Sequence, residues 1–219
     1  MRSVGITGAN GYVGSRIAGA LERAGFRVVA LIREPRANSD DRRFTLDAAI
    51  SDGLLAGLDV LVHCAWDMRV ASRDEMRRIN IEGSERLIEA ADRAGIGRVI
   101  FISSMSAFAG CKSRYGQAKL QVEARLRQSE HAVVIRPGLI YGDDPGGIVG
   151  VMAALGRKTP VLPMIGLGRY KLHTCHEDDL ADLVVACCDP QITRFEAGAP
   201  VTAAESAGRE FRDIVRTLA

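Results

Sequence analysis

The feature that most constrains this chain is a glycine-rich turn close to its start. The apolar run 4–7 leads directly into Gly8, Gly11 and Gly14, and an amphipathic stretch begins behind them. Glycine lets the backbone turn tightly and lets phosphate oxygens approach the N–H groups of a helix start, where the helix dipole favours negative charge. A second apolar run, 28–32, completes the strand–helix–strand context of a dinucleotide-binding loop. We therefore predict pyrophosphate contacts from Gly8, Asn10, Gly11, Tyr12, Val13 and Gly14.

Short apolar runs rich in β-branched residues alternate with longer stretches of helical periodicity. This alternation predicts repeated βαβ units and a parallel sheet. The predicted helices are 12–24, 75–94 and 115–129, and the predicted strands are 4–7, 28–32, 44–46, 60–65, 99–103 and 133–136. The fold class indicated is α/β, a doubly wound parallel sheet (Rossmann fold) with a small C-terminal substrate lobe.

Proline and glycine become frequent after Arg136, through residues 137–168, which argues against mostly regular structure there. We predict a dinucleotide-binding domain at 1–136 and a small substrate lobe at 137–219, with some elements of the lobe returning to the first domain. The alternative is a plain surface excursion with one helix around 147–155.

The charge balance favours a small-molecule partner. The 219 residues are 47% hydrophobic, and 29 basic against 27 acidic residues give a net charge of +2, too balanced to indicate nucleic-acid or membrane binding. Because no apolar run reaches the roughly 18 residues of a membrane helix and no signal-peptide pattern occurs, we expect a cytoplasmic protein. The five scattered cysteines predict reduced thiols and no metal site.

The chain departs from the usual NAD pattern at the end of run 28–32. An acidic residue about twenty positions past the glycine loop would select NAD by hydrogen bonding to the adenosine ribose. Arg33 and Arg36 are found there instead, and guanidinium groups suit a ribose 2′-phosphate. NADP is therefore favoured over NAD, with surface arginines as the alternative and Glu34 as an opposing feature.

Tyr115 and Lys119 are four residues apart, one turn of the predicted helix 115–129, so both project from the same face. A nearby ammonium favours the phenolate and lowers the pKa of a tyrosine, which prepares it to exchange a proton with a substrate hydroxyl or carbonyl. The strand 99–103 precedes the pair, and its carboxyl end lies at the crevice where such sheets bind ligands. The spacing predicts an acid/base centre there.

Seven elements in a shared order resemble the extended short-chain dehydrogenase/reductase family, the NAD(P)-dependent epimerases and dehydratases. They are 8–14, 59–65, 80–83, 103–108, 115–119, 136–142 and 176–181. The resemblance implies that Tyr115 is the acid/base and that Lys119 orients the nicotinamide ribose. It also implies that Ser104 polarises the substrate oxygen, with Ser106 as the second candidate.

The same resemblance implies further cofactor contacts, from Asp47 near the adenine, from Ala65 beside the pyrophosphate and ribose, and from Pro137. It implies that Asn80 organises backbone rather than reacts, and it leaves Trp66 either facing the substrate or packed as a core aromatic. Residues 173–177 are interpreted as a turn into a helix at 178–188 rather than as a zinc site. Pairing of two long helices in related folds implies a homodimer.

Two departures from the family pattern bear on the reaction. Met105 and Ser106 stand where sugar-nucleotide dehydratases carry an Asp-Glu pair, which disfavours dehydration. The interval from Ser104 to Tyr115 is short, and the usual long C-terminal substrate region is missing, so a nucleotide-sugar substrate is undersupported.

The sequence thus predicts hydride transfer between nicotinamide and a carbinol or carbonyl carbon. Net reduction or oxidation and epimerisation both stay open. The alternative is a catalytically silent NADP-binding sensor or regulatory module, which the presence of Tyr115 and Lys119 opposes.

Overall fold

The computed structural model describes residues 1–127, 129, 131–143, 145–158, 168–189 and 199–218. A seven-stranded parallel sheet with the order β10-β6-β5-β4-β1-β2-β3 forms its centre. The strands are β1 (Ser3–Thr7), β2 (Arg27–Ile32), β3 (Arg42–Arg43), β4 (Val60–His63), β5 (Arg98–Ile102), β6 (Ala132–Pro137) and β10 (Val201–Ala203). The order reverses between β1 and β4, and the crevice outside their carboxyl ends is where doubly wound sheets bind ligands. The predicted fold class is confirmed.

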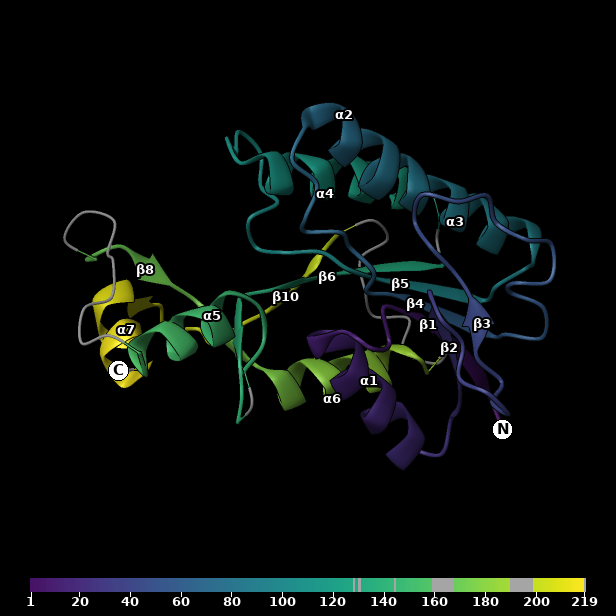
Figure 1. Cartoon of the computed structure of the whole chain (residues 1–219), viewed down its shortest axis with the longest axis horizontal. Helices are drawn as coiled ribbons and strands as arrows, with labels where there is room; N and C mark the ends of the chain where they lie inside the picture. The colour runs from purple at the N-terminus through teal and green to yellow at the C-terminus, as the bar shows by residue number, and fades with distance from the viewer. Residues whose placement is uncertain (128, 130, 144, 159–167, 190–198, 219) are drawn as a thin grey trace.

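Helices cover both faces of the sheet, α3 and α4 on one side and α1 and α6 on the other (Figure 1). They are α1 (Tyr12–Arg23), α3 (Glu82–Arg93), α4 (Arg114–Leu126) and α6 (Glu177–Cys187). Successive strand side chains face opposite sides, so Val60 and Val62 join the core under α1 and α6, whereas Leu61 joins the core under α3 and α4. A sheet buried on both faces gives continuous apolar runs, which is why its central strands are predictable from sequence.

The third strand differs from its prediction. Pairing with β2 occurs at Arg42–Arg43 rather than at 44–46. The N–H of Phe44 still donates to the carbonyl of Ile32 at 2.9 Å, but the chain then leaves the sheet. Phe44 and Leu46 are buried as loop residues in the core under α3 and α4. Their apolar alternation therefore reflects core packing and not strand pairing.

The predicted helix 75–94 is three consecutive segments: α2 (Arg73–Glu75), the π-helix η1 (Met76–Ile81) and α3. Ser72 and Glu75 form a capping box at its start, in which each side chain bonds the backbone N–H of the other residue. Single π-helical turns occur often at functional sites. The helix predicted at 115–129 begins one residue earlier, at Arg114, and ends at Leu126.

The chain after Pro137 divides between the large sheet and a separate group of elements. Strand β10, too short to be recognised in the sequence, pairs with β6, and α6 packs beside α1. The other elements are β7 (Leu139–Tyr141), α5 (Gly147–Gly156), β8 (Lys171–Leu172), β9 (Thr174–His176), β11 (Arg209–Glu210) and α7 (Phe211–Leu218). In Figure 1, α5 and α7 lie together far from the N-terminus. Several of the prolines and glycines noted above fall in 159–167, outside the described residues.

None of the described helices combines the length and the apolar character that crossing a bilayer requires. The helix found at Gly147–Gly156 agrees with the one considered around 147–155. Helix α6 and strand β10 belong to the layers of the large sheet. The division into two domains at residue 137 stays a prediction.

Candidate active site

The glycine loop connects β1 to α1 at the carboxyl edge of the sheet. Gly8 has a φ of 68°, and a Cβ there would lie 3.0 Å from the backbone nitrogen of Ala65. A Cβ on Gly14 would overlap the carbonyl of Gly8. Gly11 is the N-cap of α1, and no side chain caps that helix end, so its first N–H groups are available to an anion. This backbone fits a phosphate-bearing ligand.

A cavity of about 600 Å³ opens beside the loop. It is lined by Asn10, Gly11, Tyr12, Ser15, Arg16, Pro145 and Gly146. Three of the predicted cofactor residues therefore share one space, while Val13 packs against the apolar core and Gly14 is buried in α1. The cavity places the glycine loop next to the segment that enters α5.

Helix α1 is linked to the start of α6, a contact that the sequence did not reveal. Arg16 Nη2 lies 2.6 Å from Oε1 of Glu177, whose side chain is 3% exposed. Burial raises the pKa of the Tyr12 phenol, and the neighbouring Glu177 carboxylate raises it further. The phenol therefore stays protonated.

Ser104 and Tyr115 meet outside the carboxyl end of β5. Both side chains are half-buried. Burial raises the pKa of Tyr115, and the neighbouring Ser104 hydroxyl lowers it by a smaller amount. Ser104 Oγ also accepts the N–H of Ser106 at 3.1 Å. Ser106 is exposed, so Ser104 is the serine that faces the phenol. Lys119 lies one turn further along α4 and is 2% exposed.

The predicted effect of Lys119 on Tyr115 stays a prediction. The Lys119 ammonium donates to the carbonyl of Ile102 at 2.7 Å and lies 5.8 Å from the centre of the Tyr115 ring. It is closer to the Trp66 ring, at 3.9 Å from its centre. Burial raises the pKa of Tyr115, and the Ser104 hydroxyl opposes this effect. The ammonium is drawn toward β5 and Trp66, and burial lowers the pKa of Lys119 itself to about 7.

A buried hydroxyl fixes the end of β4 against the glycine loop. Thr7, directly before Gly8, accepts the backbone N–H groups of Cys64 and Ala65 at 3.1 Å each. Its Oγ1 also lies 2.7 Å from Nδ1 of His63. Because Ala65 is the residue that a Cβ on Gly8 would strike, Thr7 sets the close approach of the two segments.

The hydrogen bonds around His63 determine its tautomer. Ser84 donates its one hydroxyl proton to the carbonyl of Asn80 at 2.6 Å, so it accepts from Nε2 of His63 at 2.9 Å. Nδ1 is then the acceptor, and Thr7 is its donor. Burial lowers the pKa of His63 to about 3, which keeps the ring neutral. His63 therefore acts as a fixed connector between β1, β4 and α3.

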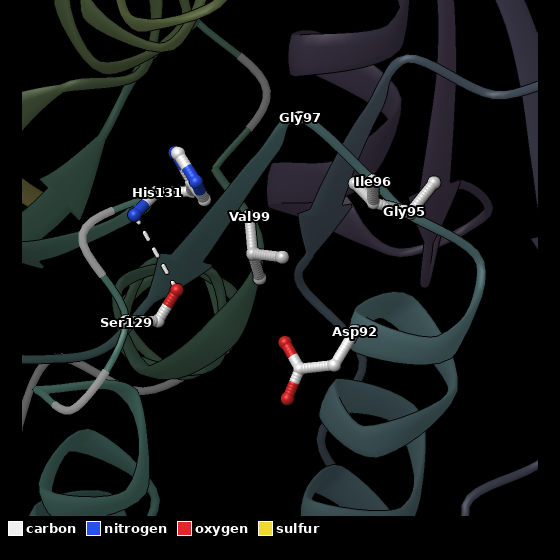
Figure 2. Close-up of a pocket in the computed structure, with 7 residues that line it drawn as sticks. All are labelled: Asp92, Gly95, Ile96, Gly97, Val99, Ser129 and His131. Carbon is white, nitrogen blue, oxygen red and sulfur yellow. Dashed lines mark hydrogen bonds between the residues drawn. The ribbon is translucent and has the colours of Figure 1, made fainter.

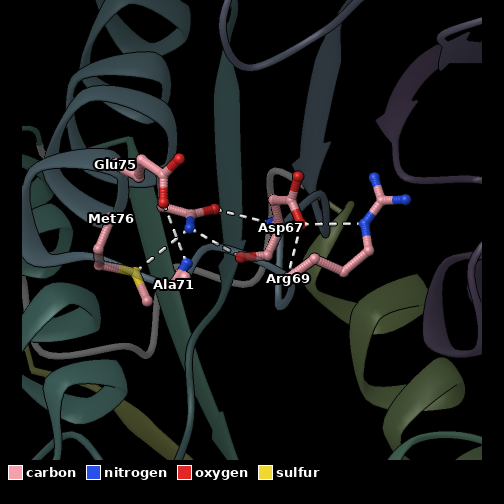
Figure 3. Close-up of polar contacts among 6 residues, drawn as sticks. Asp67, Arg69, Ala71, Glu75 and Met76 are labelled. Atoms are coloured by element: carbon pink, nitrogen blue, oxygen red, sulfur yellow. Dashed lines mark hydrogen bonds and ion pairs between the residues drawn. The ribbon is translucent and has the colours of Figure 1, made fainter.

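Asn80, in the π-helix η1, fixes the loop after β4. Its Oδ1 accepts the N–H of Asp67 at 2.7 Å, and its Nδ2 donates to the carbonyl of Asp67 at 2.9 Å and to Sδ of Met76 at 3.2 Å. Figure 3 shows these contacts around Asp67, whose carboxylate accepts the N–H of Arg69. Asn80 thus organises backbone, as the resemblance implied, and it holds the residue after Trp66.

The residues predicted for the adenosine end lie on exposed loops after β2 and β3. Arg33 is exposed, and no hydrogen bond or ion pair of its side chain occurs among the described residues. Arg36 donates to Asp41 at 2.7 and 3.0 Å and holds the pKa of that carboxyl at about 2. Asp47 is exposed, and a hydrogen bond from Thr45 lowers its pKa. Arg33 therefore has the freer guanidinium.

Pro137 ends β6 and is buried, and its carbonyl accepts the N–H of Met105 at 3.0 Å. Behind it lies an ion pair that the sequence did not reveal. Arg136 donates to both oxygens of Glu123 at 2.9 and 2.5 Å, and Ser103 donates to the same carboxylate at 2.5 Å. Strands β5 and β6 and helix α4 are joined directly beneath Ser104 and one turn past Lys119.

A second cavity, of about 260 Å³, lies at the opposite edge of the sheet, at the amino ends of β5 and β6 (Figure 2). Asp92, Ser129 and His131 contribute its polar groups. Asp92 is already paired with Arg125 at 2.9 Å, and ligands of such sheets bind at the carboxyl edge. The chemistry is therefore placed at the glycine loop and not here.

Residues 173–177 form strand β9 and a helix cap rather than the predicted turn. His176 is the N-cap of α6, and its Nδ1 accepts the N–H of Asp178 at 3.3 Å. Within the described part of the chain, no three His, Cys, Asp or Glu side chains are grouped as metal ligands. The five cysteines carry free thiols.

These features define a class: an α/β protein with a dinucleotide-binding loop and a Ser, Tyr and Lys group at the carboxyl edge of its sheet. Residues 4–193 match the model of the NAD-dependent epimerase/dehydratase family, and the chain belongs to that family. The predicted resemblance is confirmed. Family membership supports dependence on NAD or NADP.

Two curated relatives carry different activities in their names. The chain is 29% identical over 194 residues to a ceramide reductase of Caulobacter vibrioides, covering 84% of this chain and 60% of the relative. It is 26% identical over 219 residues to a UDP-glucose 4-epimerase of Vibrio cholerae, covering 86% and 67%. The chain thus spans about three fifths of the length of the reductase.

Solved structures share the fold. MoeE5 in complex with UDP-glucose and NAD superposes with a TM-score of 0.83 at 22% identity, covering 99% of this chain and 80% of that one.

Proposed function

We propose that the chain is an NADP-dependent oxidoreductase of the extended short-chain dehydrogenase/reductase type, acting at a carbonyl or carbinol carbon. The observation that supports it most is the placement of Ser104 and Tyr115 outside the carboxyl end of β5, one helical turn from Lys119, with Tyr115 packed edge-on against Trp66 in the segment that meets the glycine loop. When bound, the nicotinamide dinucleotide supplies or accepts the hydride. The name of the Caulobacter relative agrees with reduction.

The proposed roles follow from the contacts. Ser104 is proposed to polarise the substrate oxygen, and its Oγ is held in place by accepting the N–H of Ser106. Burial holds the Tyr115 phenol protonated, which is the form that donates a proton to a carbonyl oxygen during reduction. Lys119 orients the nicotinamide ribose. The residues proposed to hold the cofactor are Gly8, Asn10, Gly11, Tyr12, Val13, Gly14, Arg33, Arg36, Asp47, Ala65, Tyr115, Lys119 and Pro137.

Epimerisation is the second candidate, supported by the name of the Vibrio relative. A reductase consumes NADPH in proportion to substrate, whereas an epimerase leaves the cofactor unchanged overall. The two activities are distinguished by following the NADPH absorbance after addition of simple ketones, long-chain ketones or UDP-sugars. If the protein binds NADPH but converts none of these compounds, the result would favour the alternative of a catalytically silent NADP-binding module. Dehydration stays disfavoured by Met105 and Ser106.

Replacing Gly11 by valine is expected to raise the dissociation constant for NADPH about tenfold or more, since the branched side chain fills the space where phosphate approaches the helix end. Fluorescence of the bound nucleotide measures it. Ser15→Ala is the control, because Ser15 lines the same cavity without capping the helix start. Wild-type affinity in Gly11→Val would place the pyrophosphate elsewhere.

Replacing Arg33 by alanine is expected to weaken NADPH binding by about 10- to 100-fold and to leave NADH binding unchanged, because a hydrogen-bonded charge pair contributes about 1.5–3 kcal/mol. Parallel titrations with both nucleotides measure the ratio. Arg36→Ala is the matched control and is expected to act less, since Arg36 is already engaged with Asp41. An equal effect on NADPH and NADH would refute the 2′-phosphate contact.

A homodimer and a cytoplasmic location stay predictions. The UDP-sugars of the panel above test a nucleotide-sugar substrate, which is the substrate class in the titles of two structural neighbours, a UDP-galactose 4-epimerase and a UDP-glucose 4-epimerase.

A further inference from the structure

The ammonium of Lys119 is enclosed by aromatic rings. Its Nζ lies 3.9 Å from the ring centre of Trp66, 4.5 Å from that of Phe101 and 5.8 Å from that of Tyr115. Cations interact with aromatic faces out to about 6 Å, and most strongly with tryptophan. One conventional hydrogen bond, to the carbonyl of Ile102 at 2.7 Å, completes the environment of a side chain that is 2% exposed. The aromatic faces therefore replace much of the water that an ammonium would otherwise bind.

Trp66 is held in this place from both sides. Its ring meets Tyr115 edge-on at 5.9 Å, with 84° between the ring planes, and Phe101 at 6.4 Å. The next residue, Asp67, has its backbone N–H and carbonyl both bonded by Asn80 (Figure 3). The indole Nε1 is buried with no hydrogen-bond partner in the described part of the chain. Trp66 therefore interacts with its surroundings through the face of the indole ring and not through the indole N–H.

We infer that Trp66 is a positioning residue for Lys119. Its indole face attracts the ammonium and holds it against the carboxyl end of β5, one helical turn from Tyr115. The consequence for catalysis rests on the proposed function, whereas the contact itself is measurable in the protein without cofactor or substrate.

The other titratable groups around Lys119 keep their charge state near neutral pH. Burial lowers the pKa of Lys119 to about 7, opposed by Cys64 and Glu123. Burial raises the pKa of the Cys64 thiol to about 12 and lowers that of His63 to about 3, and it also raises the pKa of Tyr115. Glu123 is held by Arg136. Between pH 6 and pH 8, Lys119 is thus the group beside Trp66 whose charge changes.

Trp66 is the single tryptophan of the chain, so tryptophan emission reports on the surroundings of this one residue. In the full chain without nucleotide, we expect the emission to change with pH around a midpoint of about 7, and we expect Lys119→Met to abolish that change. A flat profile in the wild type, or a transition that survives in Lys119→Met, would overturn the inference.

The second test replaces the ring. The chain has four lysines, so the side-chain signals of lysine-labelled protein can be followed individually by NMR against pH. In Trp66→Leu the site stays closed but loses its attractive face, and we expect the pKa of Lys119 to fall by about one pH unit. Trp66→Phe, which keeps a ring, is expected to shift it less than half as far. Met68→Ala, on the same loop but 70% exposed, is the control and is expected to leave it unchanged.

An unchanged or raised pKa of Lys119 in folded Trp66→Leu would overturn the inference, since the indole would then only exclude water from the ammonium and not attract it. If carbonyl turnover exists, its pH profile is expected to move in Trp66→Leu by the same shift. Absence of turnover with the pKa shift present would remove the proposed function and leave the contact standing.

Discussion

Tyr115→Phe is expected to lower kcat/KM for carbonyl reduction by about 10²- to 10⁴-fold, the range that a positioned general acid contributes. The phenol is the proton donor in the proposed reaction, and burial keeps it protonated by raising its pKa. Phenylalanine keeps the ring that packs edge-on against Trp66. The unfolding temperature is therefore expected to stay close to that of the wild type, and NADPH affinity is expected to fall far less than kcat/KM.

Tyr170→Phe is the matched control for this substitution. Tyr170 is 44% exposed and stacks on Phe211, so removing its hydroxyl is expected to leave turnover intact. Steady-state kinetics, nucleotide titration and thermal unfolding are measured on both variants. Full turnover in Tyr115→Phe would remove the acid/base assignment, and a loss of NADPH binding equal to the loss of rate would leave Tyr115 with the cofactor-binding role alone.

The parts of the fold that depend on neighbouring residues could be predicted from the sequence. The central strands are continuous apolar runs because helices bury both faces of the sheet, and the glycine loop is recognisable because its constraints fall within seven residues, Gly8 to Gly14. Strand β10 could not be found in this way, since three residues carry no periodicity. The three residues of β10 form a strand because they pair with β6 at the edge of the sheet.

The placement of Tyr115 and Lys119 was predictable from the sequence, but the surroundings of the Lys119 ammonium were not. The spacing of Tyr115 and Lys119 correctly places them on one turn of α4, yet it led to the expectation that the ammonium faces the phenol. The direction of the ammonium is set by Trp66 and by the carbonyl of Ile102, which are distant in sequence or belong to the backbone. The link from Thr7 through His63 to Ser84 was missed for the same reason. A pattern of neighbouring residues in the sequence cannot predict a contact between side chains from three separate elements.

Glu123→Ala is expected to destabilise the fold by about 3–5 kcal/mol, because it leaves the Arg136 guanidinium buried without its partner. The side chains of Glu123 and Arg136 are 1% and 17% exposed, and Arg136 and Ser103 together direct three hydrogen bonds to the carboxylate. Denaturant unfolding at neutral pH measures the loss. Asp92→Ala, which removes a partly exposed pair with Arg125, is the control and is expected to cost about 1 kcal/mol or less.

The double variant Glu123→Leu with Arg136→Met tests whether the stability is lost because the Arg136 guanidinium has no partner or because the ion pair itself is missing. Replacing a buried ion pair by apolar residues of similar size is often neutral or stabilising, so most of the stability is expected to return. Ser103 precedes Ser104, and Glu123 lies one turn past Lys119, so the ion pair also sets the distance between β5 and the helix of the proposed acid/base. We therefore expect the double variant to be stable but slower than the wild type at saturating NADPH. A double variant as unstable as Glu123→Ala would contradict the view that the uncompensated guanidinium causes the loss.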